Sequence, residues 1–557
     1  MTEDGFFAVS LRSPPINGAP QLACILRDVK DALGLPSSLC LPIKESLVSP
    51  FRQPPLKIFA AAAFCTAATT SASAAGFDAA VDQFFNDYLG WFASLIFTSV
   101  PVGDASFPLI AGWLLIAALV FTLYFGFIQL RAFKLSTDIV RGRYDNPNAN
   151  HDGEVSHFAA LATALSGTVG LGNIAGVGAA LAIGGPGATF WMIIVGLLGM
   201  ASKFTECTLG VKYRTVLPSG VVSGGPMYYL SRGLAERGMG GLGKVLAVGF
   251  AIMTILGALG GGNMFQGNQA NAMLVQTFGL ADGYGWVTGI VLAGFVFSVI
   301  IGGMPSISTV TSKLVPLMAV LYVAMSITVL VVEADQIGAA FSAIWNGAFS
   351  AEGVAGGFIG ALIQGLKRAT FSNEAGVGSA AIAHSAVKTN EPVTEGLVSL
   401  LEPFIDTVVI CTMTALVITI AGLNTGPYPH AEGLTGVQLT AASFQTAYDW
   451  FRYPLALAVL MFAISTMISW SYYGLKAWTY LFGEGKTNEL IYKLMFCFFV
   501  VVGCSIGFSA VIDFSDAAIF AMSIFNIIGL YFLMPVVKAE LHKFMAKVKS
   551  GEYKRYS

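Results

Sequence analysis

A six-residue motif, Asn-x-Ala-Gly-Val-Gly, occurs twice in the chain, at residues 173–178 and 373–378. Each copy lies in a long apolar run and follows a threonine, Thr168 in the first run and Thr370 in the second. Irregular backbone within an apolar run is tolerated only where it is buried in protein or lines a cavity. Close helix packing would account for the glycines alone. The repeated Asn and Thr favour a binding site inside the membrane.

The composition indicates a membrane protein. The chain has 557 residues, 55% hydrophobic and 11% charged, with a mean hydropathy of +0.71. Soluble domains carry about 25% charged residues, so we expect the lipid bilayer to be the solvent for most of this chain. The net charge of −2 gives no reason to expect a nucleic-acid partner. The seven cysteines show neither a disulfide framework nor zinc-ligand spacing.

The chain is predicted to cross the membrane about eleven times. Each apolar segment approaches the ~20 residues that a spanning helix needs. The segments are 107–130, 158–183, 187–211, 245–277, 286–303, 311–332, 354–385, 397–422, 455–481, 490–508 and 516–537. Lysine and arginine gather in alternate loops and in the tail, and basic loops stay in the cytoplasm. We expect a multi-pass protein of the cell inner (plasma) membrane with a cytoplasmic C-terminus.

The two motif copies fall in the second and the seventh expected span, so five spans separate them. An odd number reverses the chain direction, and residues 158–332 and 333–540 are therefore predicted to be inverted repeats. Inverted repeats with interrupted helices at their centre are typical of secondary transporters, which bind substrate near the membrane midplane. The expected fold class is an all-α polytopic membrane protein.

Four further segments are expected outside the repeats. Residues 1–75 contain Lys57, a short Ala-rich stretch and small residues, the layout of a secretory signal peptide, and we expect a leader that is disordered or removed. Residues 76–106 carry apolar side chains at helical spacing with aspartates among them, which predicts an amphipathic helix on the membrane surface. Residues 107–157 should hold an extra transmembrane helix and a cytoplasmic loop, and residues 541–557 a basic cytoplasmic tail.

Four stretches of sequence, in the same order, resemble the alanine or glycine:cation symporter family of sodium:alanine symporters. They are SGTVGLGNIAGVG at 166–178, SGGPMYY at 223–229, FSNEAGVGS at 371–379 and STMISWSYYG at 465–474. The resemblance covers about residues 80 to 540. It implies a five-plus-five inverted repeat like the leucine-transporter fold, preceded by one N-terminal helix. It also implies sodium-coupled import of small neutral amino acids, such as alanine and glycine, by alternating access.

An amino-acid substrate needs donors for its carboxylate and acceptors for its ammonium group. Free N–H groups at a half-helix start supply donors, and the candidate is the backbone around Gly170–Asn173, with Asn173 as a side-chain donor. Carbonyl groups around Thr370–Ser372 are the candidate acceptors. The resemblance implies that Gln266 faces the pocket, although an interhelical hydrogen bond would also explain it, and that Trp470 limits substrate size. The expected substrate-binding residues are Thr168, Gly170, Asn173, Gln266, Thr370, Phe371, Ser372, Thr466 and Trp470.

Sodium is a hard cation that binds oxygen ligands. Carbonyl groups of Thr168 and Val169 could form a neutral cage with a hydroxyl group of Ser465, Thr466 or Ser469, and these three hydroxyls stay alternatives. Sodium is thus expected as the coupling ion, with no other cofactor and no obligatory protein partner.

Charged residues also lie in or near the expected spans, where they usually pair or line a water path. We expect structural or gating ion pairs, and a proton relay would instead favour a proton-coupled amino-acid symporter. A membrane-embedded enzyme is disfavoured because the zinc motif His-Glu-x-x-His is absent from the sequence. A channel is disfavoured because inverted repeats suit alternating access. The charged residues are Lys203, Glu206, Lys367, Arg368, Glu374, Glu402 and Asp406.

Overall fold

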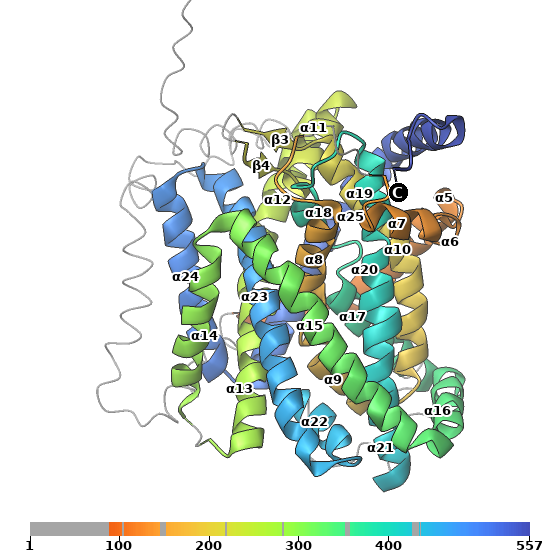
Figure 1. Ribbon diagram of the computed structural model, residues 1–557, viewed down its shortest axis with the longest axis vertical. Helices are drawn as coiled ribbons and strands as arrows, with labels where there is room; N and C mark the ends of the chain where they lie inside the picture. Colours follow the sequence, from red (N-terminus) through yellow and green to blue (C-terminus); the bar gives the residue numbers. More distant parts are fainter. Residues whose placement is uncertain are drawn as a thin grey trace, which may run out of the picture.

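The computed structural model describes residues 89–102, 105–144, 152–217, 220–280, 283–350, 357–425, 434 and 436–556. Long helices run side by side through the body of the molecule (Figure 1). The leader expected over residues 1–75 lies outside the described residues.

Seven helices or helix runs in the described ranges are long and apolar enough to cross a membrane. They are Ala188–Lys212 (α10), Gly240–Phe278, Gly303–Val332 (α15), Pro392–Thr425, Asp449–Phe482, Lys486–Ser505 (α24) and Phe508–Ser550 (α25). A bent pair, α8 (His157–Thr168) with the run Gly172–Gly184, makes an eighth. The chain is therefore a mostly helical, multi-pass membrane protein.

Several of these runs change helix type along their length. They divide into π-helical η2 (Gly172–Gly176) and α9 (Val177–Gly184); α12 (Gly240–Leu259), π-helical η3 (Gly260–Met264) and α13 (Phe265–Phe278); α19 (Pro392–Ser399), α20 (Leu401–Pro403), π-helical η5 (Phe404–Cys411) and α21 (Thr412–Thr425); and η6 (Asp449–Phe451) and α23 (Arg452–Phe482). Single π-helical turns often mark functional sites.

Shorter elements connect the long helices. They are α6 (Ile128–Arg131), α7 (Phe133–Val140), β3 (Thr215–Val216), β4 (Val222–Ser223), α11 (Pro226–Glu236), η4 (Ala334–Gln336), α16 (Ile337–Phe349), α18 (Ala380–His384) and α22 (Val437–Gln445).

The count of eleven spans stays a prediction. The expected spans 107–130 and 286–303 contain the apolar helices α5 (Leu109–Tyr124) and α14 (Gly285–Ile300), which are shorter than the others. The expected span 354–385 contains α17 (Gly357–Asn373), which ends at the second motif copy before α18 begins.

The surface helix expected over 76–106 lies only partly within the described residues, and it ends well before residue 106. Within that range, the described residues are helical only from 89 to 96. Strands β1 (Ser99–Val102) and β2 (Ala105–Pro108) follow and pair antiparallel. Valine and proline explain the change, because Pro101 lacks the N–H group that a helix interior needs and Val100 and Val102 suit a strand.

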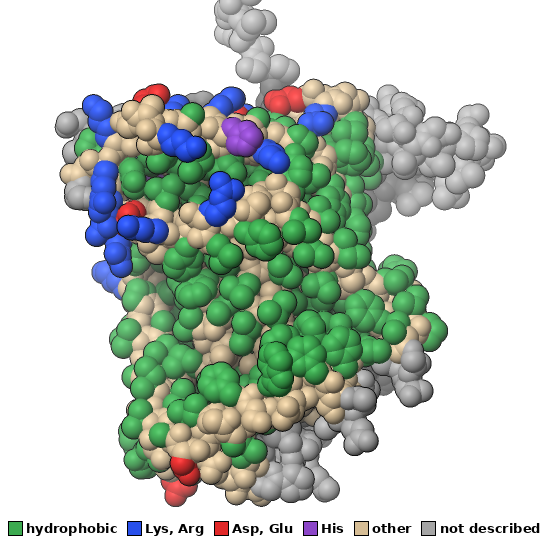
Figure 2. Space-filling view, turned by 90° about the vertical axis from the view of Figure 1, so that its right-hand side faces the viewer, with side chains coloured by type: hydrophobic (Ala, Val, Ile, Leu, Met, Phe, Trp, Pro, Cys, Tyr) green, Lys and Arg blue, Asp and Glu red, His purple; other side chains and the backbone are tan. Residues whose placement is uncertain are grey.

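The surface of the molecule has the pattern of a membrane protein. Figure 2 shows a broad belt of hydrophobic side chains, with lysine and arginine gathered at one end. Helix α15 contributes to this exposed apolar surface, since Leu317 is 61% and Val320 68% exposed. An aqueous solvent would disfavour so large an apolar area.

Candidate functional site

A small pocket lies where the first motif interrupts its helix. Helix α8 ends at Thr168, η2 begins at Gly172, and the two arms are bent by 48°. The cause is local, because Gly170 and Gly172 carry no side chain to hold a helix together. The residues lining the pocket are Gly167, Thr168, Gly170, Gly172, Gly261, Gln266, Phe371, Glu374, Thr466, Trp470 and Ile519.

The pocket is nearly filled by its own side chains. Its free volume is about 10 Å³, which is close to the least that one water molecule needs. Substituting a side chain for hydrogen at Gly170 would bring a methyl group within 3.0 Å of Thr466, and the same change at Gly262 would overlap Trp470. Because Gly170 and Gly262 lack side chains, Thr466 and Trp470 of α23 pack directly against the backbone at these two positions. The structure therefore shows the pocket in a closed form.

Backbone donors at the helix break are held by side-chain oxygens. The N–H group of Gly170 donates to Asn173 Oδ1 at 2.9 Å, and that of Leu171 donates to Gln266 Oε1 at 3.0 Å. Both donors belong to the turn that precedes η2, where a helix leaves N–H groups without helical partners. Gln266 thus both lines the pocket and makes an interhelical hydrogen bond. These are the two alternatives given above for this residue.

The two motif asparagines meet the same π-helical segment, η5. Asn173 Nδ2 donates to Asp406 Oδ1 at 2.6 Å, and Asn373 Nδ2 donates to Thr407 Oγ1 at 3.0 Å. Ser372 Oγ also donates to Asp406, at 2.8 Å. The doubled motif therefore brings both interrupted helices onto two consecutive residues of one segment.

Glu374 connects the second helix break to the pocket. Its Oε1 accepts a hydrogen bond from Trp470 Nε1 at 3.0 Å, and its Oε2 accepts one from Ser379. Glu374 has φ +55°, in the left-handed region. Non-glycine residues with positive φ cost energy and cluster at functional sites. A buried carboxylate in this conformation is the most distinctive feature of the pocket lining.

The residues predicted to hold sodium lie along the contact between α8 and α23. Ser166 Oγ donates to Ser465 O at 2.6 Å, and Ser469 Oγ donates to Thr163 O at 2.8 Å. Thr466 Oγ1 is buried and has no hydrogen-bond partner among the described residues. A buried hydroxyl without a partner is costly, so Thr466 has a free oxygen for a ligand.

The structure brings together some predicted substrate residues and leaves others out. Thr168, Gly170, Gln266, Phe371, Thr466 and Trp470 line the pocket. Asn173, Thr370 and Ser372 are buried beside it but do not line it. Asn173, expected as a direct donor to the substrate, instead uses its amide on Asp406. The role of Asn173 toward the substrate stays a prediction, and its bond to Asp406 was not expected.

Five lining residues were missing from the predicted set: Gly167, Gly172, Gly261, Glu374 and Ile519. Glu374 was anticipated only as one of several buried charges, although its place inside the second motif copy could have identified it. Ile519 comes from α25, far along the chain. Nothing in the sequence distinguishes it from other isoleucines in apolar helices.

A chain of buried ionisable side chains leads away from the pocket region. His157 Nδ1 lies 2.5 Å from Glu395 Oε2, and Glu395 Oε1 lies 2.6 Å from His384 Nδ1. His384 Nε2 contacts Glu402, whose other oxygen lies 3.2 Å from Lys203 Nζ. The expectation that buried charges pair is met here, because each member has an oppositely charged or hydrogen-bonding neighbour.

A second buried ion pair lies one helical turn from Phe371. Arg368 pairs with Asp516 of α25, and its guanidinium lies 5.4 Å from the centre of the Phe371 ring. The pair therefore joins α17 to α25 beside the pocket wall formed by Phe371 and Ile519.

The comparisons with known proteins identify the family of this chain. A family model described as the sodium:alanine symporter family matches residues 97–557. This chain belongs to the sodium:alanine symporter family. A sodium/alanine symporter of Methanococcus maripaludis is 41% identical over 424 residues, which cover 76% of this chain and 91% of that protein. An amino-acid carrier protein of Bacillus subtilis is 32% identical, covering 78% of this chain and 88% of that protein.

A solved structure, that of MhsT in complex with L-phenylalanine, aligns with 71% of this chain and 99% of its own, at 17% identity and a TM-score of 0.46. That likeness is too distant to carry an argument, and the five-plus-five repeat stays a prediction. Membership of the family confirms the expectation of a transporter rather than an enzyme.

Proposed function

We propose that this protein is a sodium-coupled symporter that imports small neutral amino acids, such as alanine and glycine, by alternating access. The observation that carries the proposal is the interrupted helix α8–η2–α9, which presents backbone donors and the free Thr466 hydroxyl to one closed pocket. The 41% identical relative named as a sodium/alanine symporter supports the choice of ion and substrate.

The substrate carboxylate is assigned to the N–H groups of Gly170 and Leu171. Side-chain amide oxygens now accept from these groups, and a carboxylate makes stronger, charge-assisted bonds in the same place. The positive end of the following helix adds a favourable field. Asn173 acts here as a positioning residue, since its amide links this turn to Asp406.

The substrate ammonium group is assigned to the second helix break. Carbonyl groups of residues 370–372 are the acceptors that the sequence predicted, and Glu374 adds a negative charge to the pocket lining. Its two oxygens accept hydrogen bonds from Trp470 and Ser379, which hold the carboxyl group in place beside the pocket. The carboxylate of the substrate thus meets hydrogen-bond donors, and its ammonium group meets hydrogen-bond acceptors.

Sodium is assigned to the contact between α8 and α23, through carbonyl groups of Thr168 and Val169 and the hydroxyl groups of Ser465, Thr466 and Ser469. The two helices are already hydrogen-bonded to each other, through Ser166 Oγ to Ser465 O and Ser469 Oγ to Thr163 O. An ion shared by these two helices would hold them together in the closed form and couple its release to their separation.

A second candidate, proton-coupled symport, is favoured by the chain from His157 through Glu395, His384 and Glu402 to Lys203. Hydrogen-bonded carboxylates and imidazoles in a membrane interior are typical of proton relays.

The orientation is also proposed from charge. Lysine and arginine crowd one end of the molecule (Figure 2), and the C-terminal part of α25 lies at that end (Figure 1). By the positive-inside rule this end, with the C-terminus, faces the cytoplasm.

The pocket wall predicts how substrate size can be changed. Ile519→Ala is expected to admit leucine or methionine, because the pocket is closed by Trp470, Phe371 and Ile519 and the change removes about three methylene-sized groups of roughly 0.8 kcal/mol each. Competition of unlabelled leucine against labelled alanine uptake measures it. Leu494→Ala, at a 47% exposed site on α24, is the matched control. If leucine competes equally poorly in both variants, Ile519 does not limit the size of the substrate.

Counterflow tests whether the protein is a carrier. Proteoliposomes preloaded with unlabelled alanine should transiently accumulate labelled alanine from outside, because an alternating site exchanges the two. A channel lets both pools equilibrate without an overshoot. Liposomes without protein give the baseline. The absence of an overshoot in folded, sodium-supplied protein would contradict the carrier proposal.

A further inference from the structure

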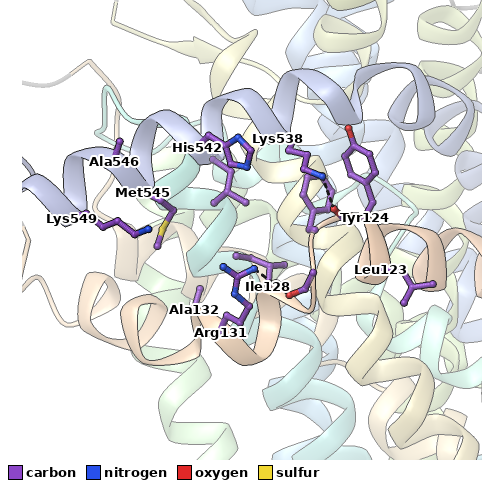
Figure 3. Close-up of a pocket in the computed structure, with 13 residues that line it drawn as sticks. Leu123, Tyr124, Ile128, Arg131, Ala132, Lys538, His542, Met545, Ala546 and Lys549 are labelled. Carbon is purple, nitrogen blue, oxygen red and sulfur yellow. Dashed lines mark hydrogen bonds between the residues drawn. The ribbon is translucent and has the colours of Figure 1, made fainter.

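A large cavity lies at the basic end of the molecule, separate from the substrate pocket. It has a volume of about 690 Å³ and lies between the end of α5, helix α6 and the C-terminal part of α25 (Figure 3). Helix α25 has 43 residues, about twice the ~20 that span a bilayer, and Pro535 lies within it. Its C-terminal part therefore extends beyond the hydrocarbon region.

The polar side of this cavity is cationic. The cations Arg131, Lys538 and Lys549 line it together with His542, and no aspartate or glutamate is among the described lining residues. In Figure 3 Arg131 points up from α6, while Lys538 points down from α25. The acidic residue of this part of α25, Glu540, pairs elsewhere, with Lys212 at 2.9 Å.

Two of these cations are held in place by backbone carbonyl groups. Lys538 Nζ donates to Tyr124 O at 3.2 Å and lies 4.3 Å from the centre of the Tyr124 ring. Arg131 Nη1 donates to Gly126 O at 3.5 Å. His542 and Lys549 make no hydrogen bond or ion pair with the described part of the chain. The cavity thus has positioned donors, and no anion among the described lining residues neutralises its charges.

The other side of the cavity is apolar. Ile128, Leu541 and Met545 line it, together with Leu123 at the end of α5. Leu123 is 57% exposed, and Leu130 of α6 is 71% exposed, so exposed apolar side chains adjoin the cavity. A soluble anion would use only the cations, whereas an amphiphile with an anionic headgroup would use both surfaces.

We propose that this cavity binds the phosphate headgroup of an anionic phospholipid from the cytoplasmic leaflet, with its acyl chains along α5. Basic pockets between helices on the cytoplasmic side are suited to such headgroups. The bound lipid would connect α5, which precedes the proposed repeats, to the C-terminal part of α25. This site is independent of substrate binding, so its failure leaves the proposed transport function standing.

The test uses full-length protein purified in detergent, with phosphatidylglycerol or phosphatidylcholine of the same acyl chains as probes. Native mass spectrometry measures how much lipid stays bound. Phosphatidylglycerol should bind well above phosphatidylcholine. The triple variant Arg131→Gln, Lys538→Gln and Lys549→Gln should bind it on the order of 100-fold more weakly, since each cation near a lipid headgroup contributes about 1 kcal/mol.

The matched control removes the same charge outside the cavity, by Arg237→Gln, Lys543→Gln and Lys554→Gln, and should keep phosphatidylglycerol binding. Ala546→Trp fills the cavity without changing charge and should weaken lipid binding, which keeps the proposal testable if the triple variant fails to fold. An equal loss of phosphatidylglycerol binding in the triple variant and in the control would overturn the proposed site. Equal binding of phosphatidylcholine, or full displacement by millimolar inorganic phosphate, would overturn an anionic lipid as its ligand.

Discussion

Gly170→Ala should lower alanine uptake roughly 100-fold, because overpacking a well-packed site costs about 1–3 kcal/mol and the added methyl group also blocks the substrate's place. The methyl would lie within 3.0 Å of Thr466. It would also lie close to Gln266, whose oxygen holds the neighbouring N–H group. Initial rates of labelled alanine uptake in proteoliposomes, normalised to folded protein, measure the effect.

The control for that variant is Gly294→Ala. Gly294 lies in α14 with open space around the position of an added methyl group, so the change tests a helical glycine without affecting the pocket. Alanine favours a helix over glycine, and the control should keep full uptake and unchanged thermal stability. Normal uptake in Gly170→Ala would show that the break at the first motif is not where the substrate binds.

Glu374→Gln is expected to raise the alanine concentration for half-maximal uptake by roughly 10- to 100-fold, since a hydrogen bond to a charged group contributes about 1.5–3 kcal/mol. The substitution is nearly isosteric. Its amide oxygen can accept from Trp470, and its amide nitrogen can donate to Ser379, so both present contacts have a replacement. The charge is therefore removed while the pocket geometry is retained.

Concentration series of labelled alanine separate the half-saturating concentration from the maximal rate in this variant. Glu552→Gln, at a side chain 67% exposed near the C-terminus, removes the same charge and should change neither. An unchanged half-saturating concentration in Glu374→Gln would show that the carboxylate supports Trp470 and does not bind the substrate ammonium group.

The architecture could be predicted because lipid imposes few solutions. A spanning segment must satisfy its backbone internally, so apolar length alone locates helices such as α10 and α23. The interruption at 168–172 was also predictable, because a run with many glycines, a threonine and an asparagine is poorly suited to a continuous lipid-facing helix. The hairpin at Ser99–Pro108 was missed because the helix indicated by the apolar spacing before it was predicted to continue past Pro101, to residue 106.

The site was only partly predictable because the sequence around a residue does not determine which distant residues it contacts in the fold. Asn173 was close enough to the break to be expected at the substrate, but Asp406, 233 residues away, accepts its amide hydrogen. Ile519 enters the lining because α25 packs against η3. Glu374 was visible as a buried charge, whereas its positive φ and its bond to Trp470 arise only from folding.

Uptake of labelled alanine into proteoliposomes under an inward sodium gradient, an inward proton gradient without sodium, or no gradient tests the central proposal most directly. Moving one charge through 100 mV is worth about 2.3 kcal/mol, so one sodium ion per substrate should drive alanine well above its external concentration. We expect accumulation with the sodium gradient alone. Uptake indifferent to sodium would contradict it, and accumulation driven by protons without sodium would favour the relay from His157 to Lys203 instead.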